Sequence, residues 1–309
     1  MAKHPRLRLG DTNAEVGRQK EEGVITLTVK VVVDSALNIP QELLLEFGIS
    51  VVPVSITIDG KTYREGVDAS RSELVALIGN SKQLSTSQPA PGDFLEMYDA
   101  LGGEILSVHL TAKSSGTYQS ASIASTMTTK AKVQVHDSAQ AALGGGWQAI
   151  AAALKGREGA TLDEMRQVAE QARAQAATFL TVPTMKYLQR SGRVNLAKAL
   201  IASLLSVKPI MTFKEGVAEV VSKSRSMPGA LKEIVSLLKE RYGDKPLAVA
   251  VMHAEDPEMA AQAKELLETE LKIQYMLVTD LTASLVVHGG PGTITISALP
   301  FELVSGLVK

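Results

Sequence analysis

The chain has 309 residues; 45% of them are hydrophobic, only 4% are aromatic, and 32 lysines and arginines nearly balance 33 aspartates and glutamates. This length allows two domains with a sizeable aliphatic core, and a net charge of −1 argues against a protein whose main partner is nucleic acid. The lack of cysteine excludes disulfides, thiol nucleophiles and cysteine metal ligands, and it fits the cytoplasm, where we expect the protein to reside. Five scattered histidines lack ligand spacing, so we expect no metal.

Neither the first segment nor the most apolar run carries a targeting or membrane signal. Residues 1–23 mix basic and acidic side chains without an apolar core, so they do not resemble a signal peptide, and we expect residues 1–28 to form a mobile arm. The most apolar stretch, residues 199–210, is too short to span a bilayer and contains Lys208. We therefore expect a protein that does not span the membrane.

Residues 29–185 alternate between predicted strands and helices. The run VKVVVDSA (29–36) predicts a buried strand, and Ser70 with Glu73 three residues later predicts a capped helix over 70–80. The other predicted strands cover 50–66 (with an Asp-Gly turn), 103–110, 132–138 and 178–183, and the other helices 39–49, about 92–100, 113–127, 139–154 and 161–176. Such alternation is typical of an α/β domain with a mainly parallel sheet flanked by helices.

Residues 186–309 have a different pattern, which predicts a second, α+β domain. We expect a helical segment from Tyr187, interrupted at Gly192, and a hairpin over 208–225 that turns at Glu215-Gly216. Helices over 229–242 and 257–270 then alternate with strands over 246–254, 273–279 and 292–299. The sequence places the domain boundary near residue 185.

Four polar turns fall at or near the carboxyl ends of predicted strands, which is the edge where open α/β sheets bind ligands. They are Asp34-Ser35, residues 85–87, residues 114–117 and Asp137-Ser138. The third turn opens a helix, and a helix N-terminus with a glycine and hydroxyl groups can bind a carboxylate or phosphate. The alternative is that each hydroxyl merely caps a helix, which is the commoner role for any single one.

Two further stretches contain candidate anion-binding side chains. HGGPG (288–292) places His288 before a glycine-rich backbone that a ligand can approach closely, and QRSGRV (189–194) supplies Arg193, which can clamp a phosphate. A histidine in this context is more often structural, and an arginine at a helix end is about as often simply solvated. LGGGW (143–147) is better explained by close helix packing, since the glycine frame of a P-loop is missing.

The ordered series of motifs resembles the DegV family of bacterial fatty-acid-binding proteins from about residue 29 to the C-terminus. The motifs are VVVDSA, STSQPAPGDF, LTAKSSGTYQSA, VHDSAQAALGGG, YLQRSGRV, KPI and HGGPG. The resemblance implies a two-domain fold with a long-chain fatty acid bound between the domains, and no catalysis by this chain alone. Many members of the family are the acyl-carrying subunit of a fatty acid kinase, whose ATP-binding partner phosphorylates the bound carboxylate for phospholipid synthesis.

The resemblance also implies which residues surround the fatty acid head group. Thr86 and Ser87 would hold the carboxylate, Ser115 and Gly116 would add a hydroxyl and a backbone N–H, and His288 would complete the shell.

Three further residues would lie at the edge of this shell. Asp34 and Ser35 would shape its rim, and Arg193 would face the kinase partner or the phosphate.

Two other functions stay open at this point. Ser115, His288 and Asp137 are residue types that form a nucleophile, base and orienting group, with the Gly116 N–H as oxyanion donor, so a serine hydrolase acting on a small ester is the main alternative. The chain lacks the G-x-S-x-G elbow of α/β-hydrolases. A protein that binds a small phosphate or a nucleotide is the other alternative, although this chain contains no P-loop motif.

Overall fold

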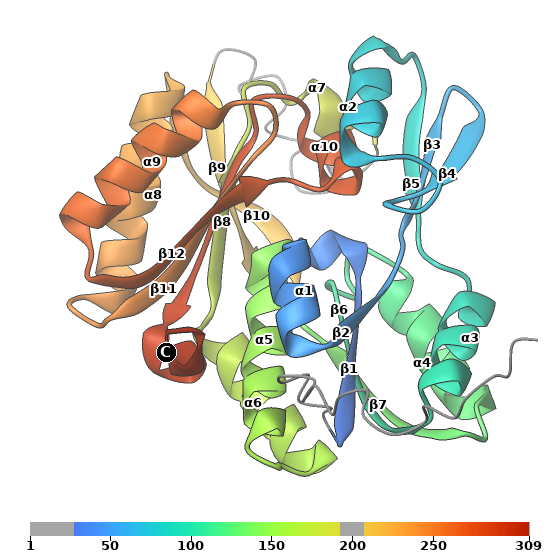
Figure 1. The fold of residues 1–309 in the computed structure, drawn as a ribbon. Coiled ribbons are helices and arrows are strands. Elements are labelled where there is room, and N and C mark those ends of the chain that lie inside the picture. Colours follow the sequence, from blue (N-terminus) through green and yellow to red (C-terminus); the bar gives the residue numbers. More distant parts are fainter. Residues whose placement is uncertain (1–27, 192–206, 309) are drawn as a thin grey trace, which may run out of the picture.

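Three β-sheets organise the part of the chain that the computed structural model describes, residues 28–191 and 207–308 (Figure 1). A four-stranded sheet belongs to the N-terminal half, a six-stranded sheet mainly to the C-terminal half, and a small three-stranded sheet packs on a helix of the C-terminal half. Within the described ranges, no helix is both long enough and apolar enough to cross a membrane. The helical segment predicted after residue 191 lies outside the described residues.

The four-stranded sheet is parallel throughout, in the order β2-β1-β6-β7. Its strands are β1 (Val29–Asp34), β2 (Ile49–Val52), β6 (Gly103–His109) and β7 (Ala131–Asp137). Helices α3 (Pro91–Leu101) and α4 (Thr117–Met127) pack on one face, and α1 (Gln41–Phe47), α5 (Leu143–Arg157) and α6 (Leu162–Gln175) lie on the other (Figure 1).

The valine run of β1 is buried on both sides because successive side chains point to opposite faces of the sheet. Val31 and Val33 join the core that contains α5, whereas Val32 joins the core that contains Phe94 and Tyr98 of α3. A strand covered on both faces needs a continuous apolar run, which is what the sequence shows.

The six-stranded sheet is mixed, in the order β10-β9-β8-β13-β11-β12, and only β11 and β12 run parallel within it. Its strands are β8 (Ala177–Thr181), β9 (Lys208–Lys214), β10 (Val217–Ser224), β11 (Leu247–His253), β12 (Ile273–Asp280) and β13 (Ile294–Pro300). Helices α8 (Met227–Tyr242) and α9 (Pro257–Glu270) cover one face. α5 contacts β8 and β13, so part of the other face is directed at the parallel sheet and its helices.

The three-stranded sheet is antiparallel and connects the two larger parts. It consists of β3 (Ser55–Ile58), β4 (Lys61–Arg64) and β5 (Leu84–Ser87), in the order β4-β3-β5. Helix α10 (Ala283–Gly289) contacts β3, β5 and helix α2 (Arg71–Asn80) at the top of the molecule in Figure 1. A short helix, α7 (Lys186–Arg190), also contacts α10.

The predicted fold class is confirmed, as are its sharpest local signals. Ser70 accepts the Glu73 N–H while the Glu73 carboxylate accepts the Ser70 N–H, which is the predicted capping box of α2. The predicted hairpin turns at Glu215 and Gly216, which both have positive φ (50° and 80°).

Two expectations differ from the structure. Residues 84–87 form strand β5, because their backbone pairs with β3, where we had expected a loop. Residues 283–289 form helix α10, which the sequence did not reveal. Strand β8, which precedes the boundary predicted near residue 185, pairs with β13 and β9 in the six-stranded sheet. The division into domains at that point remains a prediction.

Glycines at the start of α5 allow its backbone to pack closely against its neighbours. An added Cβ at Gly145 would lie 2.6 Å from Leu37 Cδ2 and 2.8 Å from Ser138 Oγ, and one at Gly146 would lie 2.8 Å from the Leu37 carbonyl oxygen. This agrees with the packing interpretation of LGGGW.

We therefore expect Gly145→Ala to lower the free energy of unfolding by about 1–3 kcal/mol through overpacking. Gly79 in α2 is the matched control, because no atom lies within 4 Å of an added Cβ there. Gly79→Ala should be neutral or stabilising by up to about 1 kcal/mol, since alanine favours helix. Urea denaturation followed by far-UV circular dichroism measures both variants, and an equal effect of the two would contradict this account.

Candidate functional site

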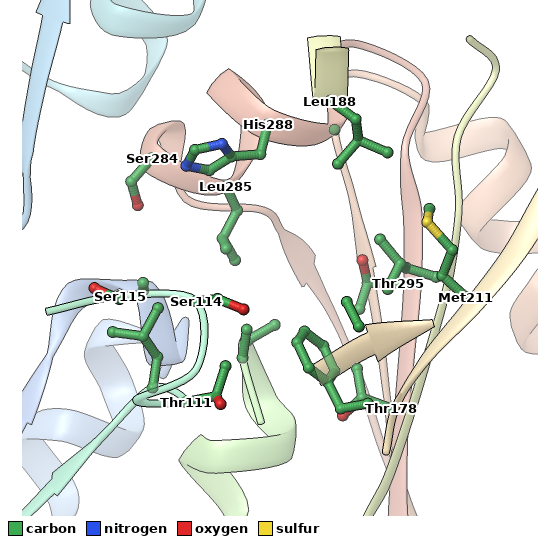
Figure 2. A pocket seen from close by; sticks show the side chains of 18 of the residues that line it. Thr111, Ser114, Ser115, Thr178, Leu188, Met211, Ser284, Leu285, His288 and Thr295 are labelled. Atoms are coloured by element: carbon green, nitrogen blue, oxygen red, sulfur yellow. The ribbon is translucent and has the colours of Figure 1, made fainter. Parts of the chain in front are cut away.

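A cavity of about 390 Å³ lies where the three sheets meet. Its walls come from the loop after β6, from β5, from α10, and from one face of β8, β9, β10 and β13. Figure 2 shows Ser284, Leu285 and His288 of α10 above the cavity, Thr111, Ser114 and Ser115 of the β6–α4 loop on one side, and the six-stranded sheet on the other. Sites for small organic ligands usually have volumes in this range.

The structure brings together two of the predicted motifs that are far apart in the sequence. Thr86 Oγ1 and His288 Nε2 lie 2.9 Å apart, and which of them donates the hydrogen bond depends on the imidazole tautomer. Thr86 stands on β5 and His288 in the last turn of α10, and both line the cavity. This contact forms one polar part of the cavity wall.

Of the other head-group residues that the resemblance implies, Ser87 and Ser115 line the cavity and Gly116 does not. Ser115 Oγ lies 2.8 Å from Thr117 Oγ1 and accepts the Thr117 N–H at 3.2 Å. Gly116 precedes α4 as its N-cap, where an added Cβ would lie 2.8 Å from Gln88 Nε2. Gly116 therefore leaves room for the Gln88 side chain, which lines the cavity.

Asp34 lies behind the wall of the cavity. It is 1% exposed, and its carboxylate accepts the N–H groups of Ala36 (3.0 Å) and Leu110 (3.0 Å) and lies 3.1 Å from His109 Nδ1. Ala36 and Leu110 line the cavity, so Asp34 fixes two pieces of wall backbone.

Ser35 likewise lies behind the wall. Its hydroxyl accepts the N–H of Val54, a lining residue, at 3.0 Å and donates to the Glu65 carboxylate at 2.6 Å.

Glu65 is a buried carboxylate that the sequence analysis did not single out. It is 9% exposed and accepts the Ser284 N–H at 2.7 Å and the Ser284 hydroxyl at 2.8 Å, in addition to the Ser35 hydroxyl. Burial raises the pKa of Glu65, and the hydrogen bonds from Ser35 and Ser284 oppose that rise. In the sequence Glu65 appears as one more polar residue at the end of a predicted strand, so no local signal distinguishes it.

The start of α10 is held by two side chains from the N-terminal half. The first N–H groups of a helix have no partner within it. Asn38 Oδ1 accepts the Thr282 N–H at 2.7 Å, and Glu65 accepts the N–H of Ser284. Asn38 Nδ2 also donates to the Asp280 carbonyl at 3.0 Å. These bonds fix the helix that carries His288 into the cavity.

The residues proposed for a hydrolase are not assembled into a triad. Asp137 Oδ1 accepts the N–H groups of Ala112 and Ala139, and Asp137 does not line the cavity that contains Ser115 and His288. Within residues 28–191 and 207–308, no hydrogen bond joins Ser115, His288 and Asp137 to one another.

Two remaining expectations concern Arg193 and metals. Arg193 lies outside the described residues, so its predicted role stays a prediction. Among the described residues, no three histidine, aspartate or glutamate side chains are grouped as metal ligands would be.

Substitutions of Glu65 test how much its hydrogen bonds to Ser35 and Ser284 contribute to stability. Glu65→Ala removes the acceptor of three hydrogen bonds, and we expect it to lower the free energy of unfolding by about 2–4 kcal/mol, because buried donors lose their partner. Glu65→Gln keeps an oxygen acceptor and should cost less than Ala. Chemical denaturation at neutral pH measures the free energy of unfolding of both variants. Equal losses for the Ala and Gln variants would contradict the hydrogen-bonding role.

The pKa of Glu65 predicts a pH dependence with a definite sign. Because the folded protein raises this pKa above its ordinary value of about 4.5, the native state holds the proton more tightly than the unfolded state. The Glu65 contribution to stability is therefore fully present below pH 4.5 and is lost as the pH rises through the folded-state pKa. The free energy of unfolding of Glu65→Gln should rise relative to wild type between pH 4 and pH 8. A constant difference over that range would contradict the prediction.

Comparison with known proteins gives one consistent family. The family model described as "Uncharacterised protein, DegV family" matches residues 28–300. A DegV domain-containing protein of Caldanaerobacter subterraneus is 32% identical over 267 residues, which cover 85% of this chain and 95% of that protein.

Solved structures of the family have the same fold. The structure described as fatty acid binding of a DegV family protein from Thermus thermophilus has a TM-score of 0.81 and 31% identity, covering 88% of this chain and 99% of that one. DegV of Bacillus subtilis, described as a fatty acid binding protein, has a TM-score of 0.80 and 28% identity, covering 89% of this chain and 100% of that one. The motifs, the fold and these matches agree: the chain belongs to the DegV family.

Proposed function

We propose that this protein binds one long-chain fatty acid in the cavity, with the carboxylate at the part of the wall formed by Thr86 and His288. The observation that carries the proposal is the uneven distribution of polar and apolar side chains around the cavity. Thr86 Oγ1 and His288 Nε2 meet at 2.9 Å in one part of the wall, whereas the sheet wall is mainly apolar, with Leu180, Met211 and Val220 among its residues. The fatty acid binding described for the relatives from Thermus thermophilus and Bacillus subtilis supports the same ligand class.

The apolar chain supplies most of the binding free energy in this proposal. Burial of a CH₂ group contributes about 0.8 kcal/mol, so a sixteen-carbon tail contributes on the order of 10 kcal/mol before ordering costs. The head-group residues then need only orient the carboxylate and satisfy its hydrogen bonds, because an unpaired buried carboxylate is costly. Thr86, Ser87 and Ser115 have donors for that purpose, and the imidazole of His288 adds another.

We propose further that the protein is an acyl carrier and not an enzyme by itself. A cytoplasmic kinase partner would bring ATP to the bound acid. A carboxylate oxygen would then attack the γ-phosphorus, the bond to ADP would break, and an acyl phosphate would form. Neutral hydroxyl donors suit this step, since they hold the carboxylate without a permanent counter-charge. Arg193 would face the partner or the phosphate.

Removing hydroxyls at this polar part of the wall tests the head-group assignment. Thr86→Val, and separately Ser87→Ala combined with Ser115→Ala, should weaken palmitate binding about tenfold or more, because each change removes donors to a charged group. Thr57→Val on β3 is the control, since Thr57 Oγ1 bonds to Thr62 and lies outside the cavity lining. Equilibrium dialysis with labelled palmitate measures the affinities. Undiminished binding in both site variants would refute the assignment.

The carrier role has its own test. The purified protein loaded with palmitate, incubated with ATP and a purified bacterial fatty acid kinase subunit, should yield acyl phosphate, which hydroxylamine traps as the hydroxamate. The loaded protein with ATP alone should yield none. Product without the kinase subunit, or no product with it, would contradict the carrier role.

A further inference from the structure

Two threonines of the strands, Thr178 of β8 and Thr295 of β13, interrupt the apolar sheet wall of the cavity. Thr295 of β13 is opposite Leu180 of β8, Leu180 is opposite Met211 of β9, and Met211 is opposite Val220 of β10. All four side chains line the cavity. A row that crosses four neighbouring strands thus consists of three apolar side chains and one threonine.

Thr295 differs from the other threonines of the wall because its hydroxyl has no hydrogen-bond partner among the residues that the structure describes. It is only 5% exposed, and no hydrogen bond to its Oγ1 occurs within residues 28–191 and 207–308. By contrast, Thr178 Oγ1 lies 3.1 Å from Ser297 Oγ, Thr111 donates to the Gly216 carbonyl at 2.6 Å, and Thr293 donates to the Gly290 carbonyl at 2.7 Å.

Thr295 lies on the side of the cavity opposite the β6–α4 loop. Figure 2 shows it with Met211 and Thr178 on the sheet, across the cavity from Thr111, Ser114 and Ser115. In the proposed binding mode, this wall faces the acyl chain and not the carboxylate.

A buried hydroxyl without a hydrogen bond destabilises the state in which it is buried. A plain alkyl chain on this wall would displace water from Thr295 and offer no partner in return. An oxygen substituent on the chain would restore the hydrogen bond, and a threonine hydroxyl can donate to a keto oxygen or pair with a hydroxyl in either direction.

We propose, building on the fatty acid binding proposed above, that the preferred ligand is an oxygenated long-chain acid. A hydroxyl or keto oxygen partway along its chain bonds to Thr295 Oγ1. Leu180, Met211 and Val220 pack against the chain on one side of that oxygen. Thr295 is then a specificity-determining residue, separate from the head-group residues.

A binding panel tests this specificity. Stearate is compared by equilibrium dialysis with octadecanoic acids that carry one hydroxyl or keto group at successive chain positions. The acid whose oxygen reaches Thr295 should bind wild type about five- to tenfold more tightly than stearate, the gain typical of one hydrogen bond. Thr295→Val should abolish that preference and bind stearate at least as tightly as wild type does. Thr295→Ser, which keeps the hydroxyl, should retain the preference.

Thr181→Val is the matched control. Thr181 is fully buried in the same sheet but does not line the cavity, and its Oγ1 lies 4.0 Å from Met227 Sδ. This variant should keep the wild-type preference.

The outcomes separate this inference from the function on which it rests. If wild type binds stearate as tightly as every oxygenated acid, or if Thr295→Val keeps the preference, the inference is overturned while fatty acid binding stands. If no acid of the panel binds wild type, the proposed function itself fails.

Discussion

The site depends on how the first backbone N–H groups of helix α10 find hydrogen-bond acceptors. A helix cannot satisfy its own first N–H groups, and here Asn38 and the buried Glu65 accept two of them from the N-terminal half of the chain. Glu65 also accepts the hydroxyls of Ser35 and Ser284, so the ends of β1 and β4 and the start of α10 meet at one carboxylate. Because α10 carries His288, this polar junction sets the position of the imidazole relative to Thr86.

In the rest of the cavity wall too, buried polar side chains accept hydrogen bonds from the backbone N–H groups of residues that line the cavity. Asp34 accepts the N–H groups of Ala36 and Leu110, and Ser35 accepts that of Val54. The residues expected at the rim thus support the wall from behind. The apolar part of the wall comes from the six-stranded sheet. Successive side chains of a strand point to opposite faces of the sheet, so every other one points into the cavity. The cavity therefore needs both halves of the chain.

Local sequence signals predicted much of the fold. The valine run of β1, the capping box at Ser70 and the turn at Glu215-Gly216 depend on neighbours in sequence, and all three are confirmed. The sheet membership of β8, the strand character of β5 and the junction at Glu65 depend on partners far away in the chain, which one sequence does not display. Helix α10, which precedes the HGGPG glycines, was also missed.

The distinction between local sequence signals and contacts of distant segments also applies to the candidate site. The hydroxyl and histidine motifs were recognisable because the ordered series resembles a family, and the structure brings Thr86 and His288 within 2.9 Å of each other. Which residues lie in the wall and which behind it depends on packing, so Gly116, Asp34 and Ser35 could not be separated from Ser115 beforehand.

The most direct test of the central claim is native mass spectrometry of the purified protein, followed by organic extraction and identification of any bound lipid. The account predicts one long-chain acid per chain. A protein that is empty as purified, and that also takes up neither palmitate, oleate nor an oxygenated octadecanoic acid when these are added, would contradict it.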